Sequence, residues 1–519
     1  MSRFHAGPFC TKHEMAGVLH ECRFAGGMSA SGQLAGFGGY FFVRDLCRVL
    51  RDVIGLRGYE SFTREMLGIL PQWQGIKTDP LTNEFPDAMP HQVFRQYVGG
   101  RLLPDDRLED AQYWTNLWGI PMESHELHGA HFVTYNCSDG PLLYLITLGK
   151  FCRVYGRAVL KDSFRHWPTG TNRTVAEAAR RCADYIVQAV KRSEDNGFGL
   201  YAVPNTNPLQ TSPSGVMRDG FDAYVRSDGT PADYNFVAYV ENQALAYEAL
   251  LFAAEFLPED TAVKSWLSLA EELRRRALEQ LWMEKTNFFA AAIDRHGQVD
   301  MISSAVFETL NGPFFEDLKD GPAYVETLVK KLYSPDFMTA IGTRMTSLEH
   351  RQLEGEYYAY QGSGAVWYVT NGIVATGLSK WHLNAAASDL GKRRLIGGID
   401  RSGEALELDY VDRTTGEPLF SPVDKPASGV STGEELCPSE LGQKDQAWTA
   451  SAALRQLHAD YDSRAPAGSW QRVLDDWAAR QARLMSAAHE IKSTGRLYVN
   501  LGKGKELKRQ RAKALGAAA

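Results

Sequence analysis

Residues 235–257 read NFVAYVENQALAYEALLFAAEFL, and this stretch decides the class of fold. Its apolar side chains recur every three or four residues, which places them on one stripe of a helix. The stripe consists of Val237, Val240, Ala244, Tyr247, Leu251 and Ala254. Pro258 follows and ends the helix, because proline has no N–H and clashes with the preceding turn. Glu241 lies in this apolar run, so we expect its carboxylate to have a partner or to face a polar cavity.

The same periodicity recurs along the chain and predicts an all-α protein. Other long helices are predicted at residues 38–54, 139–155, 174–192, 261–282, 358–380 and 443–461. Further helices are predicted at residues 89–98, 106–118, 322–332, 382–390 and 468–489. Short strands are expected at residues 132–135 and 287–293, and long Gly-, Pro- and Asp-containing loops at 197–234, 333–356 and 397–441. Long loops around helices favour a site built at one end of a helical barrel.

Composition and charge exclude several classes of protein. The 519 residues are 44% hydrophobic and carry a net charge of −7, which argues against nucleic-acid binding as the main role. There is no run of about 18 apolar residues, so we expect no membrane span. The first residues, MSRFHAGPFCTKHEM, contain no apolar signal region, and seven cysteines are an odd number, so we expect a cytoplasmic protein without a disulfide framework. The sequence leaves the oligomeric state open, a homo-oligomer included.

Residue types suited to metal binding occur near the N-terminus, but their spacing is unfavourable. Cys10, His13, His20 and Cys22 do not follow the familiar zinc-ligand pairs. The histidines within residues 125–131 lack the HExxH spacing of zinc proteases. A phosphate loop and a G-x-S-x-G nucleophile elbow are also missing from the sequence. We therefore expect no metal and no cofactor.

Carboxylates in the long loops are the stronger candidates for chemistry. The segment GVMRDGFDAYVRSD (215–228) holds Asp219 and Asp222 beside aromatic side chains, which can raise a carboxyl pKa as a general acid requires. Such Asp-Gly pairs also form ordinary turns. Glu435 and Glu440 precede the helix predicted at 443–461, where acidic residues also serve helix N-termini.

Seven blocks of the sequence, in chain order, resemble glycogen-debranching-type (amylo-α-1,6-glucosidase-like) glycoside hydrolases. The blocks are GGYFFVRD (38–45), TDPLTNEFPDAMPHQVFRQ (78–96), YNCSDGPLLYLITLGKF (135–151), RDGFDAYVRSDGTPADYNFVAYVENQALAYEALLFAAE (218–255), LWMEKTNFFAAAIDRHGQV (281–299), YAYQGSGAVWYVTNGIVATGL (358–378) and KDQAWTASAAL (444–454). Processing α-glucosidases, trehalases and mannosylglycerate or glucosylglycerate hydrolases are more distant relatives of that family.

The resemblance implies an (α/α)6 toroid, in which six inner helices are ringed by six outer ones and the active site lies at one mouth. We accordingly expect an N-terminal extension at residues 1–35 and a catalytic domain at 36–462. Residues 463–519 are expected to form a C-terminal helix and a basic tail.

The resemblance also implies inverting hydrolysis by a carboxylic acid and a carboxylate about 6.5–9.5 Å apart. By alignment the acid is Asp222, with Asp219 as the alternative. The base is Glu435; its alternatives are Glu440, Asp409 and Glu407, the last two in LELDYVDRTTGE (406–417).

Substrate-binding roles are implied for residues of several blocks. They are Arg44, Asp45, His91, Asp139, Glu241, Tyr360 and Trp367. Arginine and aspartate grip sugar hydroxyls through several hydrogen bonds, and Tyr360 and Trp367 are expected to stack on sugar rings. Arg44 and Glu241 are expected within hydrogen-bonding reach of a bound monosaccharide or of each other.

The resemblance predicts a hydrolase whose partner is a carbohydrate substrate, with an α-glucosidic bond in a small glucoside or glucan branch as the point of cleavage. The alternative is a glucosylglycerate-, mannosylglycerate- or trehalose-type hydrolase. An alternative of another class is an inactive carbohydrate-binding (α/α)6 protein, and a sugar epimerase on the same barrel is a fourth.

Overall fold

The computed structural model describes residues 9–24, 27–31, 40–95, 97–98, 101–102, 131–207, 214–219, 223–350, 360–419 and 445–461. Contacts divide the chain into two units, Met1–Ser463 and Arg464–Ala519, and every described residue belongs to the first unit. The domain boundaries expected from the sequence stay predictions.

Helices dominate the described part of the chain, as predicted. The α-helices are α1 (Lys12–Glu21), α2 (Val43–Val53), α3 (Glu60–Ile69), α5 (Gly140–Tyr155), α6 (Val175–Asp195), α7 (Val240–Phe256), α8 (Val263–Leu281), α9 (Gly321–Leu332), α10 (Tyr368–Lys380), α11 (Asn384–Ser388), α12 (Gly397–Ser402) and α13 (Ala447–His458). The short 3₁₀-helices are η1 (Leu70–Trp73), η3 (Arg157–Lys161) and η4 (Ser304–Leu310), and η6 (Asp389–Ile396) is a π-helix.

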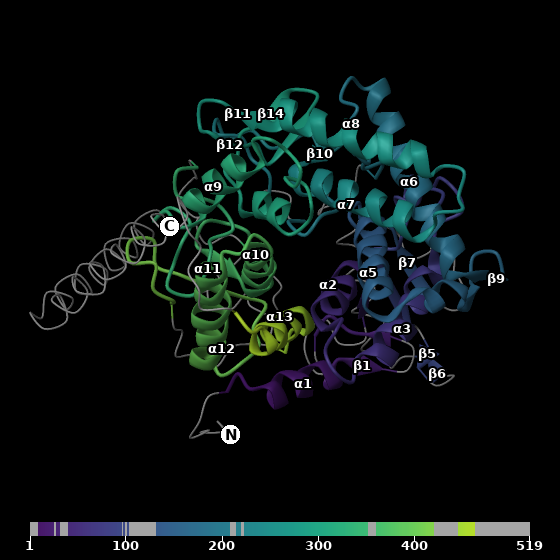
Figure 1. Cartoon of the computed structure of the whole chain (residues 1–519), viewed down its shortest axis with the longest axis horizontal. Helices are drawn as coiled ribbons and strands as arrows, with labels where there is room; N and C mark the ends of the chain where they lie inside the picture. The colour runs from purple at the N-terminus through teal and green to yellow at the C-terminus, as the bar shows by residue number, and fades with distance from the viewer. Residues whose placement is uncertain are drawn as a thin grey trace, which may run out of the picture. The chain divides into compact units, whose positions relative to one another are not determined.

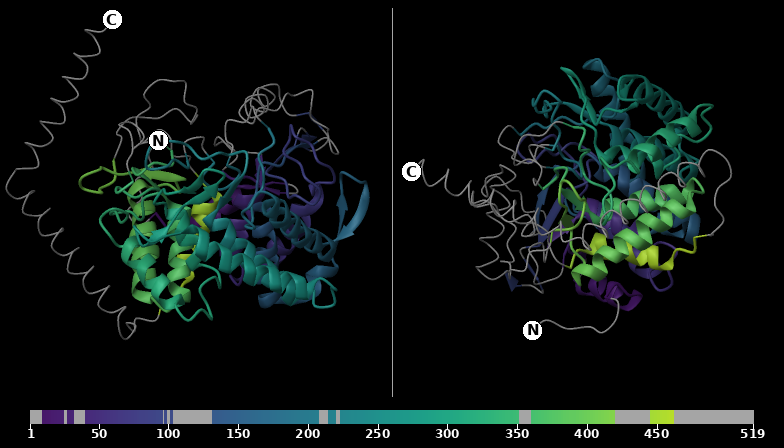
Figure 2. Two further views of the ribbon diagram at one scale, coloured as in Figure 1. Left: turned by 90° about the horizontal axis from the view of Figure 1, so that it is seen from above. Right: turned by 90° about the vertical axis from the view of Figure 1, so that its left-hand side faces the viewer.

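The strands are short and pair antiparallel in small sheets. The two-stranded sheets are β1–β2 (Arg23–Phe24, Gly27–Met28), β5–β6 (Tyr97–Val98, Arg101–Leu102), β8–β9 (Ser163–His166, Thr171–Thr174), β11–β12 (Trp282–Met283, Phe288–Phe289) and β15–β16 (Ala365–Trp367, Leu408–Tyr410). The three-stranded sheets are β3–β4–β7 (Tyr40–Phe42, Gln92–Arg95, His131–Thr134) and β10–β13–β14 (Val237–Tyr239, Ala292–Asp294, Gly297–Val299). Figure 2 shows the β8–β9 hairpin standing out from the helices at the edge of the described chain.

The helix predicted at residues 89–98 is wrong. Residues Gln92–Arg95 form β4, the middle strand of its sheet, because pairing with β3 and β7 on both sides outweighs a weak helical pattern. The helix predicted at 358–380 begins only at Tyr368, since Ala365–Trp367 pairs with β16. The loop predicted at 397–441 begins with α12, and α1, α3 and η4 were not predicted. Residues 106–118 and 468–489 lie outside the described residues.

Six elements of the described chain form a closed ring of contacts. In order they are α2, α5, α7, η4, α10 and α13, and α13 returns to α2 (Figure 1). The other helices contact the ring from outside, with α1 on α13, α3 and α6 on α5, α8 on α7, α9 on η4, and α11 and η6 on α10. The distribution of buried side chains agrees with an inner ring of elements and an outer set of helices. Nearly all residues of α5 and α7 are buried, as in a helix covered on every side, whereas α6 and α8 each have one buried face.

Small residues allow the ring elements to approach closely. A Cβ atom on Gly149 of α5 would clash with the ring of Phe252 on α7. A Cβ atom on Gly372 of α10 would lie 2.6 Å from the Cβ atom of Ala452 on α13. No helix within the described ranges has both the length and the apolar character that crossing a membrane requires.

Candidate active site

Four of the ring helices begin with the same junction, in which an extended residue leads directly into the first turn. β3, β10 and β15 run straight into α2, α7 and α10. The residues before α2, α7, α10 and α13 are extended, and none of their side chains caps the helix with a hydrogen bond. The first backbone N–H groups of these helices therefore have no cap from that side chain, and the positive ends of the helix dipoles add to their polarity.

A buried ion pair joins the start of α2 to the start of α5. The Arg44 Nε atom donates to both carboxylate oxygens of Asp139, at 2.7 and 3.0 Å, and the residues are only 3% and 2% exposed. Asp139 directly precedes α5 and makes no capping hydrogen bond; its carboxylate accepts from Arg44 and, at 3.1 Å, from the Cys137 thiol. Next to it, Asn242 of α7 donates to the Ser138 hydroxyl at 3.0 Å, which links α5 to α7 at the same end of the ring.

Two further carboxyls lie around Arg44. Burial and the neighbouring charge of Asp219 raise the pKa of Asp45 to about 7, although Arg44 lowers it. Burial also raises the pKa of Asp219, against the opposing effects of Arg44 and of Gln361, whose amide donates to Asp219 at 3.2 Å. Grouped carboxyls with raised pKa values are typical of functional sites.

Glu241 is buried in the first turn of α7, and only one of its carboxylate oxygens has a partner. The Tyr224 hydroxyl donates to Oε1 at 2.5 Å, whereas Oε2 has no hydrogen-bond partner among the described residues. Burial raises the pKa of Glu241 to about 7. The expectation that Glu241 has a partner or faces a polar cavity is thus met, but Arg44 binds Asp139 and no hydrogen bond joins Arg44 to Glu241 among the described contacts.

Asp139 and Glu241 line a cavity of about 20 Å³ at the centre of the ring, together with side chains of α2, η4 and α10. That volume is enough for one water molecule. We therefore assign this cavity to the floor of the site rather than to the position of a sugar.

Arg218 anchors the loop that precedes Asp219. It is 1% exposed, and its guanidinium donates to four oxygen atoms between 2.8 and 3.0 Å away. The acceptors are the carbonyls of Ala223, Met345 and Gln361 and the Thr346 hydroxyl. Gly215 ties the same loop to Ser138, since its carbonyl accepts from the Ser138 amide at 2.7 Å and from the hydroxyl at 3.0 Å. Both sets of contacts thus hold the segment that leads into Asp219.

Two of the base candidates accept hydrogen bonds from tyrosines, and one of these tyrosines is the predicted stacking residue Tyr360. The Tyr360 hydroxyl donates to Glu407, and burial together with the charges of Glu407 and Asp219 raises the pKa of Tyr360. Asp409 lies on β16 and accepts from the Tyr368 hydroxyl at 3.4 Å. The charges of the base candidate Glu407 and of the acid candidate Asp219 therefore both raise the pKa of the same tyrosine.

Trp367 is 1% exposed, and its ring lies against Tyr360 and Trp448 with centroids 4.8 and 5.7 Å away. Its indole N–H donates to the Tyr360 carbonyl at 3.0 Å. In this arrangement Trp367 supports Tyr360. Stacking of either ring on a sugar stays a prediction.

His91 is buried next to Phe42 and feels the charge of Arg44. Its ring contacts Phe42 edge-on at 5.4 Å, and burial and the charge of Arg44 lower its pKa well below the usual value. It is therefore neutral at physiological pH, and its binding role stays a prediction.

Sequence reasoning missed the ion pair on the floor of the site. Arg48 lies one turn after Arg44 on α2, and its Nη1 atom donates to Glu308 of η4 at 2.8 and 2.9 Å. The four-residue spacing of the two arginines was a signal for Arg48. Glu308 had none, because the short 3₁₀-helix η4 has no recognisable periodicity.

Three of the predicted catalytic residues, Asp222, Glu435 and Glu440, lie outside the described residues. The acid–base distance of about 6.5–9.5 Å therefore stays a prediction. Among the described residues, no three His, Cys, Asp or Glu side chains are grouped so that they could hold a metal ion.

Comparisons with known proteins identify the class of enzyme. Residues 192–449 match the model of the mannosylglycerate hydrolase MGH1-like glycoside hydrolase domain. The protein is a glycoside hydrolase. The matched range includes α7, η4, α10 and the loop with Asp219 and Asp222. A comparison with curated proteins finds no match.

Solved structures with the same fold come from Thermus thermophilus. A GH63 mannosylglycerate hydrolase in complex with glucose is 16% identical with a TM-score of 0.53. An uncharacterized conserved protein is 15% identical with a TM-score of 0.54. Each alignment covers 86% of this chain and 99% of the other. At such low identity the likeness concerns the fold, and this glycoside hydrolase therefore has a helical fold like that of the GH63 enzyme.

Proposed function

We propose that this glycoside hydrolase cleaves a small α-glycoside of the mannosylglycerate or glucosylglycerate type, with inversion at the anomeric carbon. The observation that carries the proposal is the match of residues 192–449 to the MGH1-like domain, because these residues include both acid candidates and all base candidates. It favours the substrate class that the sequence offered as the alternative over a glucan branch. The closed ring of six elements, with further helices outside it, supports an (α/α)6 toroid as the scaffold.

The arrangement at the N-terminal ends of the ring helices suits the work that inversion requires. Asp222, as the acid, would protonate the leaving oxygen, while a carboxylate on the opposite side activates water. Arg44 and Asp139 would hold sugar hydroxyls as one rigid, buried unit. The Oε2 atom of Glu241 is an acceptor without a partner among the described residues, and a sugar hydroxyl would satisfy it.

The test is hydrolysis by the full-length chain. We would offer α-mannosylglycerate, α-glucosylglycerate, trehalose and isomaltose, and measure the release of free sugar. Proton NMR during the first turnovers reads the anomeric configuration of the product. We expect the glycerate-type compounds to have the highest kcat/KM and the product to be β-configured.

A matched pair of variants separates chemistry from folding. Asp222→Asn should lose turnover, whereas Asp228→Asn, a change at an exposed aspartate of the same loop, should not. Preference for trehalose or isomaltose would contradict the substrate class, and an α-configured product would contradict inversion. Sugar binding without any hydrolysis would favour the inactive carbohydrate-binding protein.

A further inference from the structure

A second pocket lies at the end of the ring opposite to the candidate active site. Its volume is about 350 Å³, and it is lined by the C-terminal halves of α2 and α5, by one face of α10, by Arg455 of α13 and by Asn311 after η4. Arg44 and Asp139 lie at the N-terminal ends of α2 and α5, the opposite ends of two of these elements. The volume is within the usual range for small-molecule sites.

The lining of this basic pocket is dominated by positive charge. Its five basic residues are Arg48, Arg51, Lys150, Arg153 and Arg455, and Asp52 is its acidic residue. Glu308 contacts Arg48 and Arg51, Glu255 pairs with Arg153, and Glu248 interacts with Lys150. Five basic groups therefore face four acidic ones.

Asp52 and Lys150 are two groups of the lining whose charge burial disfavours. Burial raises the pKa of Asp52, against the opposing effects of the Ser451 hydroxyl and of Arg455, Arg51 and Lys150. Burial and the neighbouring Arg51 lower the pKa of Lys150 to about 7. Both groups are shifted toward their neutral forms, whereas the arginines of the lining stay charged.

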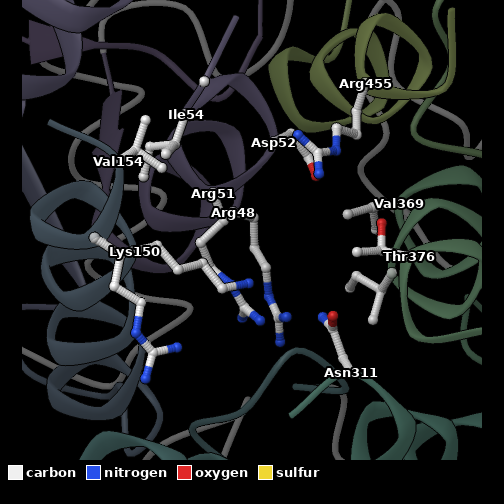
Figure 3. A pocket seen from close by; sticks show the side chains of 13 residues that line it. Arg48, Arg51, Asp52, Ile54, Lys150, Val154, Asn311, Val369, Thr376 and Arg455 are labelled. Atoms are coloured by element: carbon white, nitrogen blue, oxygen red, sulfur yellow. The ribbon is translucent and has the colours of Figure 1, made fainter. Parts of the chain in front are cut away.

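Arg51 is a buried arginine whose guanidinium lacks hydrogen-bond partners among the described residues. It is 8% exposed, and neither Nη1 nor Nη2 has a hydrogen-bond partner among the described residues. Its nearest carboxylate is Glu308 at 3.6 Å, and Arg48 already donates to both oxygens of that carboxylate. Figure 3 shows Arg48 and Arg51 side by side, pointing into the pocket, with Asn311 facing them from the other wall. A buried guanidinium without acceptors is costly unless a ligand supplies them.

Stabilisation of helix ends does not explain Arg51. Basic side chains near helix C-termini are favourable because they interact with the last carbonyl groups and with the helix dipole. Arg51 lies in the last turn of α2, but its Nη atoms donate to no carbonyl among the described residues. The pocket beyond it is also far larger than one water molecule.

We propose that the basic pocket binds a small phosphorylated molecule through its phosphate group. Guanidinium groups recognise phosphate oxygens with paired hydrogen bonds, and tetrahedral phosphate accepts donors from several directions. Arg51 of α2 and Asn311, directly after η4, supply donors from two walls of the pocket, whereas the Thr376 hydroxyl of α10 already donates to the Gly372 carbonyl at 2.9 Å. The remaining volume accommodates a group of about monosaccharide size.

The test is calorimetric titration of the full-length chain with inorganic phosphate and with glucose 6-phosphate, at constant ionic strength. Glucose alone reports any binding of the sugar part at the active site. We expect one phosphate-dependent site, and Arg51→Met and Arg455→Met should each weaken phosphate binding at least tenfold. Arg275→Met removes an exposed arginine of α8 outside the pocket and should leave binding unchanged.

Unfolding midpoints show whether each variant is folded, and Arg455→Met provides a second variant if Arg51→Met is unstable. Tighter binding of glucose 6-phosphate than of phosphate supports a phosphorylated metabolite as the ligand. Equal affinities overturn the monosaccharide part of the proposal and leave phosphate itself. Absence of binding at millimolar phosphate, or equal binding by wild type and both variants, overturns the site.

Discussion

Replacing Glu241 with glutamine should make the protein more stable at alkaline pH and less active. The carboxyl is 7% exposed, and burial raises its pKa from 4.5 to about 7. Below pH 4.5 the carboxyl is protonated in the folded and unfolded states alike. As the pH rises from 4.5 to 7, the unfolded chain releases this proton and the folded chain retains it, so the free energy of unfolding decreases.

The shift of about 2.5 pKa units corresponds to about 3 kcal/mol, fully expressed above pH 7. Glu241→Gln has no charge to bury, and its side-chain oxygen can still accept from Tyr224. We expect the variant to exceed the wild type by up to about 3 kcal/mol near pH 8 and to match it near pH 4.5. The measurement is urea unfolding between about pH 5 and pH 8, with exposed Glu284→Gln as the control.

Activity provides the second measurement on the same variant. If Oε2 accepts a hydrogen bond from a sugar hydroxyl, glutamine with its oxygen on Tyr224 places an NH2 donor at that position, and the loss of the acceptor should lower kcat/KM by about ten- to hundredfold. A variant that is destabilised near pH 8 would refute the reasoning, because it would mean that the charged carboxylate is compensated in the fold. Unchanged kcat/KM would remove Glu241 from the substrate site.

Three further predictions concern catalysis and the buried ion pair. Asp222→Asn should lower kcat by about 10²–10⁴-fold with little change in melting temperature, and near wild-type turnover would move the acid to Asp219. Of Glu435→Gln and Asp409→Asn, only the variant of the true base should show a loss of the same size in steady-state kinetics; two active variants would leave the base among the other candidates. Arg44→Met should lower the free energy of unfolding by about 3–5 kcal/mol in chemical denaturation, because Asp139 keeps a buried charge without its cation. The double variant Arg44→Met/Asp139→Leu should recover most of the lost free energy. A loss below about 1 kcal/mol in Arg44→Met would contradict the buried pair.

The local sequence pattern was sufficient to predict the long helices, and the resemblance of the sequence blocks was sufficient to predict the class of enzyme. The apolar run at residues 235–257 predicted α7, and Pro258 lies just beyond its observed end at Phe256. The anomaly of Glu241 within that run was also visible in the sequence, because a carboxylate on an apolar stripe requires a reason. The resemblance led to glycoside hydrolases, which the family match confirmed, and the same match favours the substrate class offered as the alternative.

Contacts between distant residues decided the rest. Arg44 meets Asp139 across 95 residues, and Arg48 meets Glu308 across 260 residues, so no periodicity in either segment could pair them. Residues Gln92–Arg95 became a strand because β3 and β7 flank them, a neighbourhood that exists only in the folded chain. The same holds for the basic pocket. Its residues look like ordinary surface charges in the sequence, and only the closing of the ring buries Arg51 with no hydrogen-bond acceptor for its Nη atoms among the described residues.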